Sequence, residues 1–214
     1  VSATTITGDD LRLRSDKLTS RVGLFVDLRN GNYTVSFDGQ LGRYLIPGLG
    51  IVDVRSQLRV IPGPGGRGIR VVGTGEAIVR RLDNSFLLTL AGGLPRITTG
   101  LERGPDGILY LRNLRLTAPA ITATGNGYRR VDGSFYFEGQ GRQAQYGPFS
   151  LKLDGRIERP RLDILLSSPL PALGLRDVRL LLDPTAAGFD YRAQGGSTLG
   201  PFTSNGAILL PSGG

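Results

Sequence analysis

The chain has 214 residues, a hydrophobic fraction of 39% and a formal net charge of +8, with no cysteine, histidine, methionine or tryptophan. The missing thiols and imidazoles exclude disulfides, zinc–thiolate sites and histidine-based acid–base catalysis. The basic residues favour anionic partners, but they are scattered and lack the dense patch with stacking aromatics that nucleic-acid binding needs. We therefore expect no nucleic-acid partner, no metal and no cofactor.

Alternation of apolar and polar residues predicts strands with one buried and one wet face along most of the chain. The 33 glycines and 13 prolines fit many short strands joined by turns. Residues 1–8 are predicted as an edge strand. Two alternating runs, 22–28 and 33–37, flank Asn30-Gly31-Asn32 and predict a hairpin.

The middle of the chain interrupts the alternation. Residues 41–50 are predicted as a connection, and the Gly- and Pro-rich start of 62–68 as a loop. Gly73 and Gly75 indicate a bulge or tight bend. Residues 84–92 predict one short helix, because cap-forming residues precede an apolar face that two glycines close. A buried strand is the alternative for this segment.

The rest of the chain predicts further short strands. Turns are expected at 105–107, 125–127 and 195–196, and a loop at 168–174. No interval is long and helical enough for a βαβ unit, so the sheet is expected to be antiparallel or meandering.

A short phrase recurs as FDGQ at 37–40, FEGQ at 137–140 and LDGR at 153–156. A two-residue hairpin at each Asp/Glu-Gly would set apolar residues opposite polar ones, whereas a continuous strand keeps the apolar stripe in phase. We favour the continuous strand and keep the hairpin as the alternative. Three inner-face glycines would then curve the sheet: Gly39, Gly139 and Gly155.

The predicted fold class is all-β: one elongated, strongly curved antiparallel or meandering sheet over 1–214 that forms a groove with an apolar interior. A weak division is expected near 62–68 or 92–107. The alternative is a sandwich whose own side chains fill the interior. The residues predicted to line the groove are Tyr33, Val35, Phe37, Leu114, Leu116, Phe135, Phe137, Leu151, Leu153, Leu162, Ile164, Leu180 and Leu182.

Three segments resemble one family: GPFSLKLDGRIERPRLDILLSSP (147–169), GFDYRAQGGSTLGPFTSNGAILLP (188–211) and NGYRRVDGSFYFEGQGRQAQYGP (126–148). They are similar to the AsmA-like TamB family, the translocation and assembly module proteins of Gram-negative bacteria, and to its alphaproteobacterial members. The resemblance is clearest over 94–211. It implies a β-taco fold in a periplasmic protein that is anchored in the inner membrane outside this segment.

The same resemblance implies lipid transport between the inner and outer membranes, and a part in the assembly or secretion of outer-membrane proteins such as autotransporters. The implied partners are a phospholipid or other acyl lipid and an outer-membrane assembly protein of the Omp85 type. The absence of methionine fits a piece of a longer protein. The chain contains no run of about 18 apolar residues, so no membrane-spanning helix is predicted within it.

A non-catalytic groove that shelters acyl chains is the leading hypothesis. The family offers no catalytic residues, and we expect no enzyme here, because Asp9/Asp10 lie in a polar turn and PGPGGRG at 62–68 lacks the residues of a phosphate-binding loop. One alternative is a chaperone-like scaffold that binds outer-membrane protein strands by β-augmentation. Another is a passive structural sandwich or fibre segment.

Overall fold

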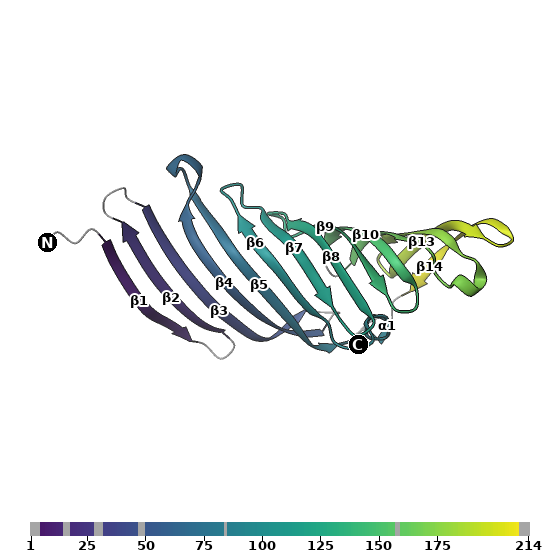
Figure 1. The fold of residues 1–214 in the computed structure, drawn as a ribbon, viewed down its shortest axis with the longest axis horizontal. Helices are drawn as coiled ribbons and strands as arrows, with labels where there is room; N and C mark the ends of the chain where they lie inside the picture. Colours follow the sequence, from purple (N-terminus) through teal and green to yellow (C-terminus); the bar gives the residue numbers. More distant parts are fainter. Residues whose placement is uncertain are drawn as a thin grey trace.

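The computed structural model describes residues 5–14, 18–27, 32–46, 50–83, 85–156 and 159–209. Within these residues, fourteen strands form one sheet in which spatial order follows sequence order (Figure 1). All neighbouring strands are antiparallel. The predicted all-β, meandering fold class is therefore confirmed.

The elements follow each other along the chain without a long crossover. The strands of the first half are β1 (Thr5–Arg14), β2 (Leu18–Asp27), β3 (Asn32–Ile46), β4 (Gly50–Pro62), β5 (Ile69–Leu82), β6 (Arg96–Arg103) and β7 (Leu109–Thr117). Those of the second half are β8 (Ile121–Arg129), β9 (Phe135–Gln143), β10 (Gly147–Arg156), β11 (Arg159–Leu166), β12 (Arg176–Pro184), β13 (Gly188–Ser197) and β14 (Gly200–Leu209). The helical elements are η1 (Pro64–Gly66), α1 (Ser85–Ala91) and η2 (Pro171–Leu173).

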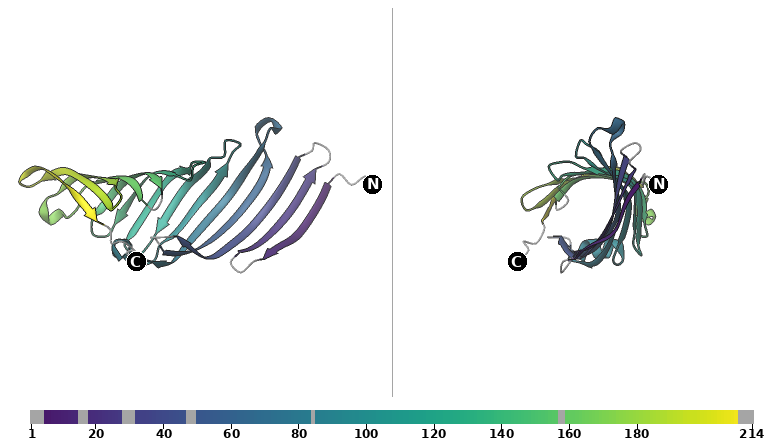
Figure 2. Two further views of the ribbon diagram at one scale, coloured as in Figure 1. Left: turned by 180° about the vertical axis from the view of Figure 1, so that it is seen from behind. Right: turned by 90° about the vertical axis from the view of Figure 1, so that its left-hand side faces the viewer.

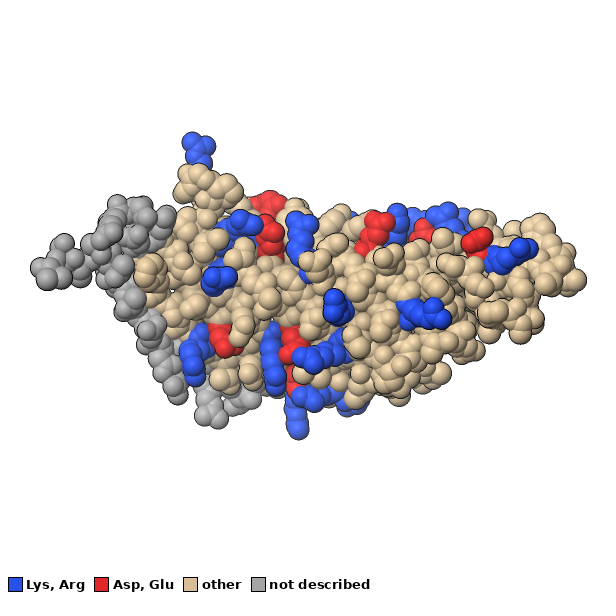
Figure 3. Space-filling view, viewed as in Figure 1, with Lys and Arg blue, Asp and Glu red and all other residues tan. Residues whose placement is uncertain are grey.

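The sheet is curled rather than flat. Seen end-on, the strands follow an open curve, with the strands of the first half forming one wall (Figure 2). The convex side carries the acidic and basic side chains visible in Figure 3. The strand ends at the β4–β5, β6–β7 and β8–β9 turns form one rim, here called the η1 rim, and the opposite strand ends form the α1 rim (Figure 1).

The strand register places most of the apolar residues on one side of the sheet. Residues opposite each other in antiparallel strands share a face, so a row can be followed from strand to strand. The central row, from β2 to β14, is Val22, Phe37, Leu58, Gly73, Leu101, Leu111, Gly127, Phe137, Leu153, Leu162, Leu182, Tyr191 and Gly206. No charged residue interrupts this row, and we call its side of the sheet the apolar face.

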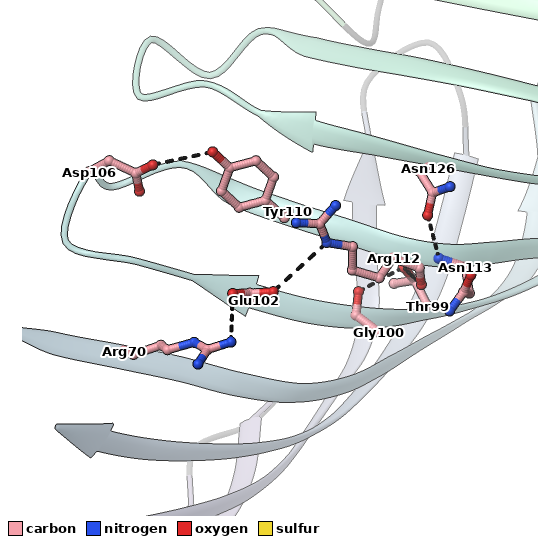
Figure 4. A network of polar contacts seen from close by, with 9 residues as sticks. All are labelled: Arg70, Thr99, Gly100, Glu102, Asp106, Tyr110, Arg112, Asn113 and Asn126. Carbon is pink, nitrogen blue, oxygen red and sulfur yellow. Dashed lines mark hydrogen bonds and ion pairs between the residues drawn. The ribbon is translucent and has the colours of Figure 1, made fainter. Parts of the chain in front are cut away.

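A β-bulge keeps the apolar face in phase where the sequence spacing changes. Leu111 and Leu114 are three residues apart and would lie on opposite faces of a regular strand. The register of β7 shifts between them, and Asn113 has a positive φ of 49°. The Asn113 backbone N–H donates to Asn126 Oδ1 at 2.8 Å (Figure 4). The bulge therefore returns Leu114 to the apolar face while the exposed amide stays hydrogen-bonded.

The predicted helix is present and is held at the α1 rim. Ala120 N–H donates to the Ala91 carbonyl oxygen at 2.8 Å. Gln143 is 5% exposed, and its Nε2 donates to the Leu90 carbonyl oxygen at 3.2 Å. Gln143 Oε1 accepts the backbone N–H groups of Gln145 and Tyr146. These bonds fasten α1 to the ends of β8 and β9.

Several predicted breaks are wrong because strands run through them. The predicted connection over 41–50 is largely strand, since β3 continues to Ile46 with a register shift between Leu41 and Tyr44. The predicted turns at 125–127 and 195–196 lie inside β8 and β13.

No register shift occurs at Gly73 or Gly75, where a bulge was predicted. A Cβ atom at Gly73 would lie 1.9 Å from the Gln57 carbonyl oxygen. Gly73 therefore permits a close approach of neighbouring backbones rather than a bend. Residues 1–4 of the predicted edge strand and Asn30-Gly31 of the predicted hairpin lie outside the described residues.

Candidate functional site

The residues predicted to line a groove all lie on the apolar face. Phe137, Leu153, Leu162 and Leu182 belong to the central row. The next row towards the α1 rim includes Leu151, Ile164 and Leu180. The remaining members are Phe37 of the central row, Tyr33, Val35 and Phe135 at two-residue spacing on β3 and β9, and Leu114 and Leu116, which the β7 bulge returns to this face. The sheet brings together side chains far apart in sequence, while their predicted role in holding lipid stays a prediction.

The recurring phrases at 37–40 and 137–140 lie inside β3 and β9, as the continuous-strand interpretation expected. A Cβ atom at Gly39 would lie 2.6 Å from the Phe37 ring, and one at Gly139 would lie 2.7 Å from the Phe137 ring. Each ring therefore covers a glycine two residues further along its own strand. The missing side chain gives the ring room to lie against the sheet.

The third phrase ends a strand. Gly155 is the penultimate residue of β10 and has a φ of +118°, which side chains rarely tolerate. It pairs with Phe135 and Pro160 on the apolar face. That the three glycines curve the sheet stays a prediction, although all three lie on its concave side.

The apolar face has little cover. Among the described residues, the buried apolar side chains are few: Val52, Val79, Ala91, Ala123, Val178 and two prolines, Pro160 and Pro169. The chain exposes 13939 Å², whereas a compact monomer of its 22.9 kDa mass exposes roughly 9,600 Å². No second layer of strands packs against the sheet in the described part of the chain. The inner side chains are therefore mostly half-buried rather than enclosed.

The convex face, here called the polar face, carries a dense set of ion pairs. Glu76 lies between Arg55 and Arg96, and Glu102 lies between Arg70 and Arg112 (Figure 4). The other pairs on this face include Arg80–Asp53, Arg130–Asp154, Lys152–Glu138, Arg161–Asp183, Arg179–Asp163 and Arg192–Asp183. Because each paired acid lies beside one or two basic side chains, the opposite charges largely cancel and leave little net electrostatic potential around the pairs.

Hydrogen bonds shift the ionisation of several acids on the polar face. The backbone N–H of Arg43, in the β3 bulge, and the Arg80 side chain lower the pKa of Asp53. A bidentate contact from Arg179 lowers the pKa of Asp163. Both carboxylates are therefore ionised at neutral pH.

A tyrosine ladder crosses the same face. Tyr128 and Tyr136 stack with ring centroids 5.3 Å apart, and Tyr110 lies 6.2 Å from Tyr128. Arg112 and Arg130 lie over the Tyr110 and Tyr128 rings. The negative charge of Asp106 raises the pKa of Tyr110, whose hydroxyl donates to Asp106 (Figure 4). The ladder stiffens the polar face across β7, β8 and β9.

Two arginines form an exception to this division of charge. Among the paired positions of β2–β14, Arg103 and Arg129 are the only charged residues on the apolar face, and both pair with Leu109, which lies between them. Arg103 Nε donates to the Gly107 carbonyl oxygen at 3.3 Å, and the Arg129 guanidinium carbon lies 5.9 Å from the Phe135 ring centroid. Neither forms an ion pair with a described residue. Arg103 lies two residues after Leu101, and Arg129 lies two residues after Gly127. This spacing was the sequence signal that could have placed both arginines on the apolar face.

Two open hollows on the polar face were also not predicted. One, of about 700 Å³, lies over β2–β5 between polar rows that include Ser36 and Thr74. The other, of about 620 Å³, lies over β7–β10 and includes Arg115, Thr122 and Arg142. The linings also include central-row residues such as Phe37 and Leu58 in the first hollow, and Leu116 and Ala123 of the apolar face in the second.

Comparison of the chain with protein-family models, curated proteins and solved structures gives no match. The resemblance to the TamB family therefore stays a prediction. In the described part of the chain, no helix has the length and apolar character to cross a membrane. The same residues contain no group of three or more potential metal-binding acidic, histidine or cysteine side chains.

Proposed function

We propose that the apolar face holds lipid acyl chains and that the chain is a non-catalytic segment of a lipid-transport protein. The observation that carries this proposal is the central row, which remains apolar or glycine across thirteen consecutive strands without a covering layer. Each methylene buried there is stabilised by about 0.8 kcal/mol. Many equivalent contacts along the row favour holding a chain while allowing it to slide.

The resemblance of 94–211 to the TamB family supplies the biological setting of the proposal. If the resemblance holds, the segment lies in the periplasm and takes part in lipid transfer to the outer membrane and in outer-membrane protein assembly. An open, curled sheet with an apolar concave side supports such a role. The anionic-partner preference of a +8 chain agrees with phospholipid as the ligand.

Photo-crosslinking from the two faces tests the proposal. A photoreactive residue is placed at Leu58 or Leu153 on the apolar face, or at the adjacent Gln57 or Lys152 on the polar face. After incubation with phospholipid vesicles, mass spectrometry should find lipid adducts at the two leucine positions. Adducts of equal yield at the two polar positions, or none at the leucines, would contradict an acyl-chain site.

An unpaired strand edge favours one second candidate function. β14 pairs with β13, and no described strand pairs with its other edge. Free backbone groups on such an edge can bind an extended peptide by β-augmentation. A chaperone-like scaffold for outer-membrane protein strands would crosslink such peptides through Thr203 or Asn205. The lipid proposal expects no peptide adducts at these positions.

A further inference from the structure

We infer that Arg103 and Arg129 form a binding site for the phosphate group of a lipid whose acyl chains lie on the apolar face. This inference rests on the proposed function and adds a site to it. The two guanidinium groups are the only charges at paired positions of that face in β2–β14, and neither has a carboxylate partner among the described residues. An anionic ligand would supply the missing partner.

The spacing of the two arginines suits one shared anion. Arg103 ends β6 and Arg129 ends β8, so they lie two strands apart at the same rim. Two inter-strand steps separate their backbones by about 10 Å. Long, flexible arginine side chains that start from these positions can both reach a phosphate above Leu109.

The surroundings of the pair explain why the ligand would be amphipathic rather than a free anion. Val71 and Phe135 flank the two arginines in the same row, and Leu101 and Leu111 lie in the next row. An anion bound here would therefore touch an apolar surface on three sides. A lipid phosphate gains from that surface through its attached chains, whereas inorganic phosphate does not.

The two rims differ in a way that orients the ligand. The arginines lie at the η1 rim, while β5, β8 and β9 carry the buried residues Val79, Ala123 and Gln143 nearer the α1 rim, where Gln143 bonds to the Leu90 carbonyl oxygen of the helix. The β6 strand spans about 20 Å from the Arg103 row to the Ile97 row. One leaflet of a bilayer core is about 15 Å deep. We therefore expect the phosphate at the η1 rim and the chains directed towards α1.

The polar face offers a matched control pair. Arg115 on β7 and Arg142 on β9 are exposed and, like the rim pair, form no ion pair with a described residue. Replacing them removes the same charge from the chain but leaves the apolar face unchanged. Any effect of net charge on lipid binding will appear equally in both double variants.

The experiment compares wild type, the Arg103→Gln/Arg129→Gln variant and the Arg115→Gln/Arg142→Gln variant after circular dichroism has shown equal folding. Fluorescent phosphatidylglycerol and fluorescent diacylglycerol in neutral micelles are the two probes. The rim variant should bind phosphatidylglycerol about tenfold more weakly and diacylglycerol as wild type does. The control variant should match wild type with both probes.

The outcomes separate the site from the function. The phosphate site is overturned if both variants lose phosphatidylglycerol affinity equally, or if the rim variant loses none. The proposed function still stands in that case, provided that wild type binds diacylglycerol. Failure of wild type to bind either probe contradicts both. Inorganic phosphate is added as a competitor, and full displacement at concentrations comparable to the lipid would show a free-anion site in place of a headgroup site.

Discussion

The polar and apolar faces share one backbone, but their side chains differ in the partners they have within the sheet. On the polar face, acids such as Glu102 and Asp183 each contact two arginines on neighbouring strands. On the apolar face, Phe37 and Phe137 cover glycines of their own strands, and most other side chains remain half-exposed. The paired acids of the polar face already have their partners within the sheet. The apolar face would gain from a ligand, which is the difference on which the proposed function depends.

The largest effect is expected where the apolar face has no space for a side chain. A Cβ atom at Gly125 would lie 2.2 Å from the Glu138 carbonyl oxygen and 2.7 Å from the Phe137 ring. Gly125→Val should lower the free energy of unfolding by about 3 kcal/mol, measured by chemical denaturation. The adjacent polar-face variant Thr124→Val should change it by less than about 0.5 kcal/mol. Equal effects would show that the two faces are packed alike.

A smaller effect is expected where the apolar face is open. Leu153 is half-buried in the central row, so Leu153→Ala should cost about 1 kcal/mol of unfolding free energy, below the 2 to 5 kcal/mol of an enclosed leucine. Added lipid should widen the difference between wild type and variant in thermal denaturation. A loss above about 3 kcal/mol without lipid would indicate a filled interior and so a sandwich-like core.

The smallest effect is expected from a single ion pair of the polar face. Arg179 lowers the pKa of Asp163, so this pair stabilises the fold above the unfolded value near pH 4 and loses its effect as the pH falls through the lowered pKa. Asp163→Asn should cost less than about 1 kcal/mol at pH 7. The difference should shrink in high salt and vanish in acid. A loss that persists in acid would point to packing instead.

Alternation was sufficient to predict the fold class and the composition of the apolar face. Residues such as Leu151 and Leu153 are two apart, and a pleated strand sends them to the same side regardless of the rest of the fold. The same reasoning favoured a continuous strand over a hairpin at 137–140, because a continuous strand keeps Phe137 and Gly139 in phase. The cap residues before Phe86 and the glycines after Ala91 predicted α1 for equally local reasons.

Features that depend on neighbouring strands were not predictable. Gly125 and Gly127 were interpreted as a turn, but their role is to accommodate the Glu138 and Tyr136 carbonyl oxygens of β9. The bulge at Asn113 needs an acceptor from β8, which sequence spacing cannot reveal. Arg103 and Arg129 are recognised as a pair only when the strand register is known, because it places them on either side of Leu109. Each of these depends on long-range pairing rather than local pattern.

The strictly sequential order of the strands has a consequence for how the molecule holds together. Each interior strand pairs with the strand before it and the strand after it in the chain, as in a repeat array. The stability of the sheet is therefore a sum of contacts between nearest neighbours. A pair of strands inserted or lost at one point leaves the register elsewhere untouched. The length of such a sheet is therefore free to vary by whole hairpins while its cross-section is preserved.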